Sequence, residues 1–195
     1  MITGLDHLVL LARDLDDAVR SHEVLLGCKP AWRTAGDGAA TAIFTLANMS
    51  LEIMAPSGNG TTGDRVRARL EEQGEGLTSL CFRVDGIDSF HRRLRRLGLN
   101  PEDVAVSGST NADDGATLSW KRTRTPVEAA HGVRLFFLDM DSERPRSPVT
   151  ANAPIDGLDH VVIATDAPER AAALYGAKLS LDMRLDLTRP DWNAR

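Results

Sequence analysis

The sequence has few of the residues that mark secreted, membrane-bound or nucleic-acid-binding proteins. Its 195 residues include two cysteines, Cys28 and Cys81, too few for the disulfide framework of a small secreted domain. We interpret both as buried thiols in a reduced cytosol. No apolar run approaches the roughly 20 residues that span a bilayer. The first seven residues lack the basic region of a signal peptide, so we expect a cytoplasmic protein.

The charge balance and several missing motifs exclude further classes of function. The net charge is −5, which argues against nucleic acid as a partner. The basic run at residues 91–96 is interpreted as a solvated helix face. The sequence contains no Gly-x-Ser-x-Gly, Cys-x-x-Cys or His-Glu-x-x-His motif, so a nucleophile elbow, a redox pair and a helical zinc site are not predicted.

What the sequence does contain is an internal repeat. Residues 4–10 read Gly-Leu-Asp-His-Leu-Val-Leu, and residues 157–163 read Gly-Leu-Asp-His-Val-Val-Ile. A weaker copy, Gly-Leu-Thr-Ser-Leu-Cys-Phe, occupies residues 76–82. Each copy is followed by a helical pattern, and an aspartate stands at the N-cap position after the first and third copies. The chain is therefore predicted to repeat one small unit that begins with a strand and a helix.

Alternating and helical patterns extend the prediction to an α+β fold. The first unit is predicted as β-α-β-β-β, with its helix stopping at Gly27. The middle unit is predicted to follow the same order. We expect a glyoxalase-like domain over residues 1–140, built from modules 1–56 and 76–140 and a linker helix within 57–75. An inter-domain linker over 141–156 and the start of a second such domain over 157–195 complete the prediction.

The third unit is predicted to be truncated. It supplies a strand at 157–163, a helix and a candidate strand at 180–187, too little to bury its own apolar faces. We expect the chain to be the N-terminal part of a longer multi-module protein. The alternative is that the tail packs on the first domain or on another chain.

The Leu-Asp-His-Leu-Val-Leu opening, the helix ending in Leu-Leu-Gly and the strand 49–54 resemble the vicinal oxygen chelate superfamily, which includes glyoxalases, bleomycin-resistance proteins and extradiol dioxygenases. The resemblance implies two paired modules whose curved mixed sheet forms an incomplete barrel. It also implies a divalent metal, Zn, Ni, Mn or Fe, held by residues of the first and last strands of the modules. Some members carry no metal and only sequester a ligand.

Two residues occupy the positions of the family's metal ligands. His7 stands at the first-strand position and Glu52 at the last-strand position, and Glu52 could also act as a proton-transfer base. A carboxylate in an apolar strand is costly unless it is paired or bound to a cation. The alternatives are a hydrogen-bonded core histidine and an exposed or salt-bridged Glu52.

The other positions depart from the metal pattern or lie elsewhere. The middle unit has Ser79 and Phe136 at the ligand positions, which leaves the cage incomplete. Ser79, Phe136 and Trp120 are instead predicted to line a ligand-binding cavity, although Trp120 is also explained by sheet packing. His160 occupies the first-strand position of the third unit and is predicted as a metal ligand of a second domain.

The sequence thus predicts a metal-dependent lyase, isomerase or dioxygenase that acts on a small oxygenated substrate. The alternatives are a metal-free module that sequesters a small molecule and a non-catalytic N-terminal domain. Exposed strand edges favour a homodimer.

Overall fold

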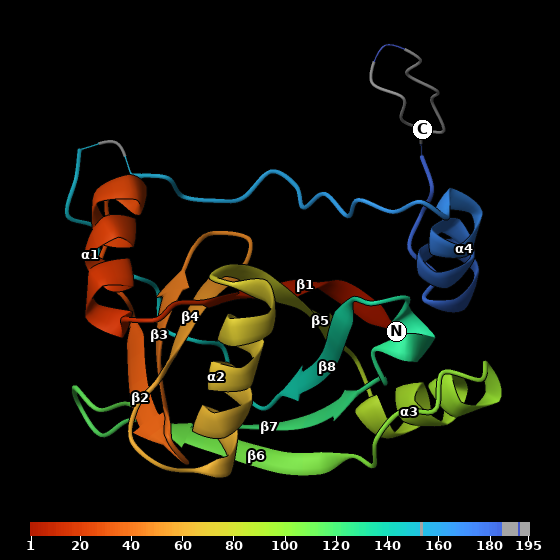
Figure 1. The fold of residues 1–195 in the computed structure, drawn as a ribbon, viewed down its shortest axis with the longest axis horizontal. Coiled ribbons are helices and arrows are strands. Elements are labelled where there is room, and N and C mark those ends of the chain that lie inside the picture. The colour runs from red at the N-terminus through yellow and green to blue at the C-terminus, as the bar shows by residue number, and fades with distance from the viewer. Residues whose placement is uncertain (153, 185–190, 192–195) are drawn as a thin grey trace.

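The computed structural model describes residues 1–152, 154–184 and 191, and these form one mixed sheet with helices around it (Figure 1). The first half contains β1 (Ile2–Leu11), α1 (Leu15–Leu26), β2 (Trp32–Gly36), β3 (Ala39–Thr45) and β4 (Ser50–Pro56). Helix α2 (Thr61–Gln73) leads to β5 (Gly76–Val84), α3 (Ile87–Arg96), β6 (Ala105–Thr110), β7 (Thr117–Arg124) and β8 (Arg134–Met140). Helix α4 (Pro168–Ala172) and a π-helical turn (Ala173–Lys178) follow.

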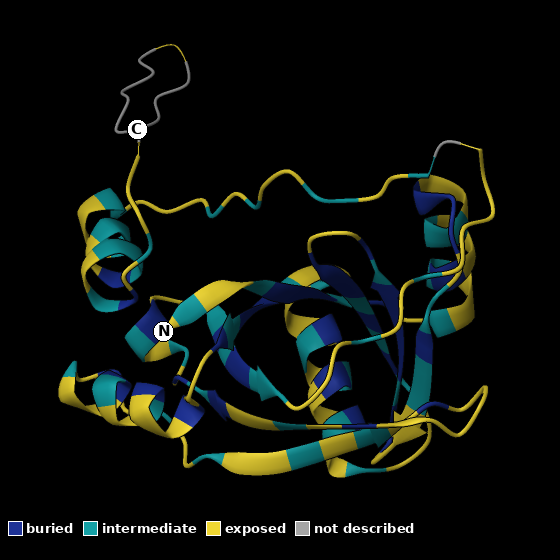
Figure 2. Cartoon of the chain, turned by 180° about the vertical axis from the view of Figure 1, so that it is seen from behind, coloured by how far each residue is buried: buried dark blue, intermediate teal, exposed yellow. Residues whose placement is uncertain are grey.

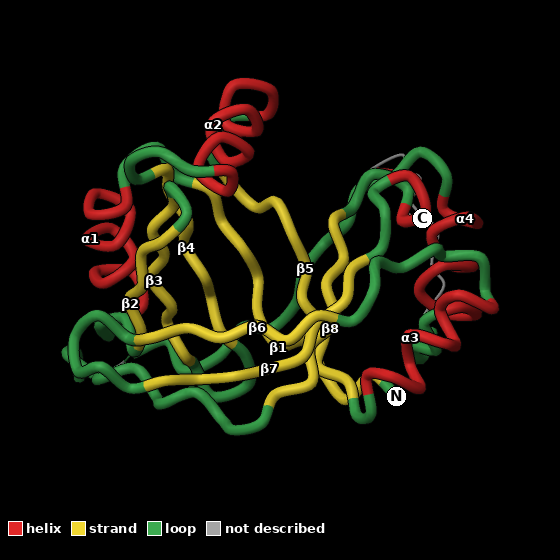
Figure 3. The backbone as a smooth tube through the Cα atoms, turned by 90° about the horizontal axis from the view of Figure 1, so that it is seen from below, coloured by secondary structure: helices red, strands yellow, loops and turns green. Residues whose placement is uncertain are grey.

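The described strands are ordered β2-β3-β4-β1-β5-β8-β7-β6, which confirms the predicted α+β class with a mixed sheet. Strand β1 runs parallel to β4 and antiparallel to β5, and β5 runs parallel to β8. The sheet curves until its edge strands, β2 and β6, come together. Two hydrogen bonds join this edge: Trp32 Nε1 donates to Ser109 Oγ at 2.7 Å, and the Ala112 amide donates to the Arg33 carbonyl at 2.8 Å. The result is a nearly closed barrel (Figure 3).

The main hydrophobic core lies between the outer face of this sheet and helices α1 and α3. Its fully buried members include Phe44 and Ile53 from the first half, and Leu94 and Phe137 from the second. Figure 2 shows the buried residues along the strands and on the inward sides of the helices. The opposite, inner face carries both polar and apolar side chains, among them His7 and Val9.

Helix α2 packs at one end of the barrel. Its buried Val66 and Leu70 contact Leu11, Ala39 and the partly buried Met54. The β2–β3 turn holds the start of the helix, because both carboxylate oxygens of Asp37 accept hydrogen bonds from residues 61 and 62. The predicted linker helix therefore has a fixed position.

The junction between this turn and α2 has no room for a methyl group. A Cβ on Gly63 would lie 2.0 Å from the Gly38 carbonyl oxygen. We expect Gly63→Ala to lower the free energy of unfolding by about 1–3 kcal/mol, since the two backbones would have to separate. Chemical denaturation measures the change. Gly36→Ala is the matched control, because a Cβ there meets no atom within 4 Å, and an equal loss in both variants would contradict the packing explanation.

The Asp37 cap also predicts a pH dependence. Hydrogen bonds from the Thr62 hydroxyl and from the Thr62 and Thr61 amides hold the pKa of Asp37 below its ordinary value. The pKa of an aspartate in the unfolded chain is about 4. Because the pKa of Asp37 is lower in the folded state, its carboxylate stabilises the fold above about pH 4, and this stabilisation is lost as the pH falls through the folded-state pKa. Asp37→Ala should therefore lower Tm at neutral pH, with a difference from the wild type that narrows toward about pH 3. The exposed Asp103→Ala variant should show no such trend.

The C-terminal segment follows the outside of the barrel (Figure 1). The predicted linker lies against the first half, where the Lys29 amide donates to the Pro148 carbonyl and Ser147 Oγ accepts from the Thr45 amide. The prediction of a strand at 157–163 is wrong, because this stretch pairs with no described strand. A strand from this stretch could not pair with β1 or β5, because β1 already lies between β4 and β5, and β5 lies between β1 and β8. The predicted helix is present, but it begins after Ala167 rather than Asp166.

Residues 180–184 of the last predicted strand are not in a strand, and 185–187 lie outside the described residues. Leu174 and Leu179 are buried in the main core. The described part of the tail thus packs on the first domain.

Among the described residues, the structure has no helix whose length and hydropathy would let it cross a membrane.

Candidate functional site

Two rows of side chains cross the inner face of the barrel. The strand register aligns Ser50, His7, Cys81 and Phe136 in one row, and Glu52, Val9, Ser79 and Arg134 in the next. Residues paired on neighbouring strands point to the same face. The register thus places the predicted residues His7, Glu52, Ser79 and Phe136 on one concave surface.

A break in the register at the start of β1 explains the polar cluster around His7. The pairing shifts between Leu5 and His7, so one extra residue, Asp6, stands opposite β5. Such a bulge interrupts the alternation of side chains. The Asp6 and His7 side chains therefore meet, and His7 Nδ1 donates to Asp6 Oδ1 over 2.7 Å.

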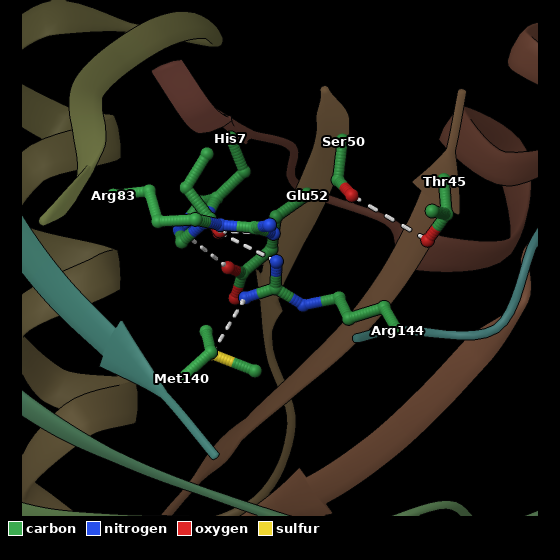
Figure 4. Close-up of polar contacts among 8 residues, drawn as sticks. His7, Thr45, Ser50, Glu52, Arg83, Met140 and Arg144 are labelled. Carbon is green, nitrogen blue, oxygen red and sulfur yellow. Dashed lines mark hydrogen bonds and ion pairs between the residues drawn. The ribbon is translucent and has the colours of Figure 1, made fainter. Parts of the chain in front are cut away.

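His7 links two carboxylates. Its second ring nitrogen, Nε2, lies 3.3 Å from Glu52 Oε2 (Figure 4). The His7 side chain is 10% exposed and that of Glu52 is 15% exposed. The two residues that the sequence predicts as metal ligands are thus adjacent in a nearly enclosed site.

Asp6 is the centre of a buried ion cluster. Its side chain is fully buried, and Arg83 contacts Oδ2 at 3.0 Å while Arg144 contacts Oδ1 at 2.5 Å. Arg144 comes from the predicted linker, yet its side chain is only 7% exposed and reaches the Met140 sulfur (Figure 4). The linker therefore contributes a buried cation to the barrel interior.

The electrostatics of the cluster favour charged groups. Burial alone would raise the pKa of Asp6, but the hydrogen bond from His7 and the charge of Arg144 outweigh it and hold the pKa well below its usual range. Burial raises the pKa of the Cys81 thiol, so Cys81 is neutral at neutral pH. Burial would lower the pKa of His7, but the adjacent Cys81 sulfur, the hydrogen bond to Asp6 and the charge of Glu52 raise it above the ordinary value. The raised pKa favours the imidazolium form of His7.

The donor atoms fit a divalent cation on the Glu52 side of the imidazole. Two ligands that each lie about 2.1 Å from one ion are about 3.0–3.5 Å apart, which matches His7 Nε2 and Glu52 Oε2. Asp6 on Nδ1 is the carboxylate partner that metal-bound histidines commonly have. A cation would replace the proton at Nε2. With two protein ligands, the other coordination positions are open to water or substrate.

A second arrangement is less favourable. Asp6, His7 and Cys81 are the one group of three candidate ligands found among the described residues, with ligand atoms within 4.8 Å of one another. Asp6 is already paired with Arg83 and Arg144. A further cation on that side would meet two guanidinium groups, so the Glu52 side is favoured.

The remaining predicted residues have different surroundings. Ser79 is buried and Phe136 is half-buried, and both lie on the inner face. Trp120 packs with Trp32, Ile43 and Leu118, and its register partner is Met140. His160 lies outside the cluster on the exposed C-terminal segment, where its side chain is 70% exposed and Nδ1 contacts Asp159 at 2.7 Å.

A cavity of about 360 Å³ reaches Asp6 from one end of the barrel. Its walls include the start of β1, the β3–β4 turn and the segment that carries Arg144. The cavity provides room for a small ligand beside the His7 cluster.

Sequence reasoning missed Asp6, Arg83 and Arg144 as members of the site. The duplicated Asp-His pair was a usable signal, since Asp159 and His160 form the same short contact as Asp6 and His7. The part played by Arg144 had no local signal, because Asp6 lies 138 residues away in the chain.

The sequence pattern of the glyoxalase-like domain family matches residues 5–181. The chain therefore belongs to the glyoxalase-like domain family, and its fold is that of the vicinal oxygen chelate superfamily. A comparison with curated proteins gave no significant match.

Solved structures with the same fold include methylmalonyl-CoA epimerases. The enzyme from Streptomyces coelicolor, in complex with 2-nitronate-propionyl-CoA, is 18% identical with a TM-score of 0.57, over 73% of this chain and 100% of that chain. The epimerase from Mycobacterium tuberculosis is 23% identical with a TM-score of 0.53, over 71% and 88% of the two chains. A hypothetical protein from Bacillus halodurans is 16% identical with a TM-score of 0.56, over 73% and 98%.

Proposed function

We propose that this protein is a metal-dependent enzyme of the isomerase type that acts on a small oxygenated substrate inside the barrel. The observation that carries the proposal is the 3.3 Å separation of His7 Nε2 and Glu52 Oε2 beside a buried Asp6. In this proposal His7 and Glu52 hold one divalent cation.

The residues around the cation have separate tasks. A bound cation supplies Lewis-acid stabilisation of negative charge on neighbouring substrate oxygens. Asp6 orients the His7 ring through Nδ1. Glu52, beside His7 Nε2, would accept a proton from a carbon next to a carbonyl with the carboxylate oxygen that does not hold the cation. Arg144, buried beside Asp6, holds the Asp6 carboxylate in place through its contact to Oδ1.

Proton transfer is favoured over dioxygenation. Non-haem iron oxygenases usually use two histidines and one carboxylate. In the described part of the chain, the cluster contains one histidine. The solved epimerases with this fold are named for the same reaction type. An isomerase-type reaction therefore requires the fewest groups beyond those in the cluster.

A second candidate is a metal-free module that sequesters a small molecule. It is favoured by one observation: both ring nitrogens of His7 already contact carboxylates, so the buried imidazolium is compensated without a cation. The cavity beside Asp6 would then be the binding site.

We also retain the hypothesis that residues 157–195 begin a second glyoxalase-like domain, which the repeated Gly-Leu-Asp-His sequence supports.

Metal analysis separates the two candidates. Purified, tag-free protein is incubated with Zn²⁺, Ni²⁺, Mn²⁺ or Fe²⁺, freed of unbound ion and analysed by mass spectrometry. We expect near-stoichiometric metal in the wild type and its loss in His7→Ala, because His7 supplies one of two protein ligands.

His160→Ala is the matched control, since His160 has the same sequence context but an exposed side chain. It should retain the metal. A wild type that binds no divalent ion would reject the enzyme proposal and favour the sequestering module.

A further inference from the structure

A second cavity, separate from the one beside Asp6, is lined by arginines. It has a volume of about 410 Å³ and lies between α2 and strands β7 and β8. Its charged lining residues are Arg65, Arg69, Glu72, Glu102, Arg124 and Arg134. We call it the arginine groove.

The positive charge of the groove is only partly neutralised. Arg124 pairs with Glu102 at 2.6 Å. Within the described ranges, no carboxylate lies at ion-pair distance from Arg65, Arg69 or Arg134. Arg65 and Arg69 are four residues apart, so they share one face of α2. The cavity is thus lined by four arginines and two glutamates, and its arginines outnumber its carboxylates.

Arg134 is the most unusual of the three. It is half-buried on β8, and its guanidinium carbon stands 5.7 Å from the centre of the Phe136 ring. Burial and the nearby Arg69, Arg124 and Arg65 lower its pKa. A cation held among other cations is unfavourable unless an anion joins them. The Phe136 ring and the charge of Glu102 compensate the Arg134 cation only in part, because its pKa is still lowered.

The groove opens onto the same inner face as the His7 cluster. Arg134 shares a register row with Ser79, Val9 and Glu52, and Phe136 shares the neighbouring row with Cys81 and His7. Strands lie about 4.8 Å apart, so the backbones of Arg134 and Glu52 are no more than about 14 Å apart across three strand spacings. One extended small molecule could reach both places.

We propose that the arginine groove binds a phosphoryl group of a small-molecule ligand, with Arg134 at its base and Arg65 and Arg69 above it. Guanidinium forks from several directions suit the oxygens of a phosphoryl group, which accepts more hydrogen bonds than a carboxylate. The binding needs no metal. If the proposed function holds, the phosphoryl group anchors the substrate while its oxygenated end lies at His7 and Glu52.

Calorimetric titration of metal-free protein with pyrophosphate tests the assignment at low ionic strength, where charge screening is weak. We expect Arg134→Gln to weaken pyrophosphate binding at least about tenfold, as the loss of a charge-assisted contact predicts. Arg65→Gln should also weaken pyrophosphate binding. Because Arg65 is exposed on α2, this variant should fold normally even if Arg134→Gln does not. Arg95→Gln, an exposed arginine of α3, makes the same change of net charge and should leave the affinity unchanged.

His7→Ala should bind pyrophosphate as the wild type does, which separates this site from the metal site. The proposal is overturned if pyrophosphate does not bind, or if Arg134→Gln and Arg95→Gln have equal effects. Succinate tests the chemical class. Weaker binding of succinate than of pyrophosphate supports a phosphoryl ligand, and tighter binding overturns that assignment.

Discussion

Asp6→Asn is expected to lower the free energy of unfolding by about 3–5 kcal/mol, because the change removes one partner from a buried ion network. The Asp6 carboxylate is fully buried and contacts His7, Arg83 and Arg144. An asparagine has nearly the same shape, so packing is kept while the buried His7 and Arg144 and the half-exposed Arg83 lose their counter-ion. Equilibrium denaturation of the metal-free protein measures the loss.

Asp159→Asn is the matched control, since Asp159 also precedes and contacts a histidine but has a side chain that is 97% exposed. Its stability should be unchanged. Adding Arg144→Met to Asp6→Asn should recover part of the loss, because one uncompensated charge is removed. A loss below about 1 kcal/mol, the size typical of exposed pairs, would show that the cluster is better hydrated than its burial indicates.

Glu52→Gln is expected to weaken divalent-ion binding by more than about 100-fold. Loss of a group that only orients a metal ligand weakens binding by up to about 100-fold, and loss of a ligand itself should cost more. Glutamine keeps the size of the side chain but removes the charge that faces His7 Nε2. The Glu52 side chain is less buried than Asp6 and contacts no arginine in the described structure, so the fold should tolerate the change. Titration calorimetry with Zn²⁺ and Mn²⁺ measures the affinity.

Glu71→Gln provides the control, because Glu71 is an exposed glutamate on α2 and the net charge changes equally. It should bind metal as the wild type does. Unchanged affinity in Glu52→Gln would mean that any bound ion lies elsewhere, for example at Asp6, His7 and Cys81.

Much of the barrel could be predicted because its information is local and repeated. The last strand of the first unit, predicted at 49–54, lies within two residues of β4, Ser50–Pro56. The Asp14 cap and the Gly27 stop bound α1 as expected, since Asp14 accepts from the Asp17 amide and Gly27 adopts a left-handed conformation. The third copy misled the prediction, because a strand forms only where a neighbouring strand has free hydrogen-bonding groups.

The candidate site could be predicted only in part, for a physical reason. His7 and Glu52 lie on strands whose alternation fixes their direction, so motif and register were enough to bring them together. Asp6 should point away from His7 by alternation, and only the bulge reverses this. Arg144 and Arg134 gain their roles from contacts between distant segments, which no local pattern encodes.

The most direct test of the central claim is a crystal structure of the protein grown with Mn²⁺ or Zn²⁺, with anomalous data collected near the absorption edge of the metal. The account predicts one ion at full occupancy, about 2.0–2.2 Å from both His7 Nε2 and a Glu52 carboxylate oxygen. An ion between Asp6 and Cys81, or a barrel with no anomalous peak at saturating metal, would contradict it.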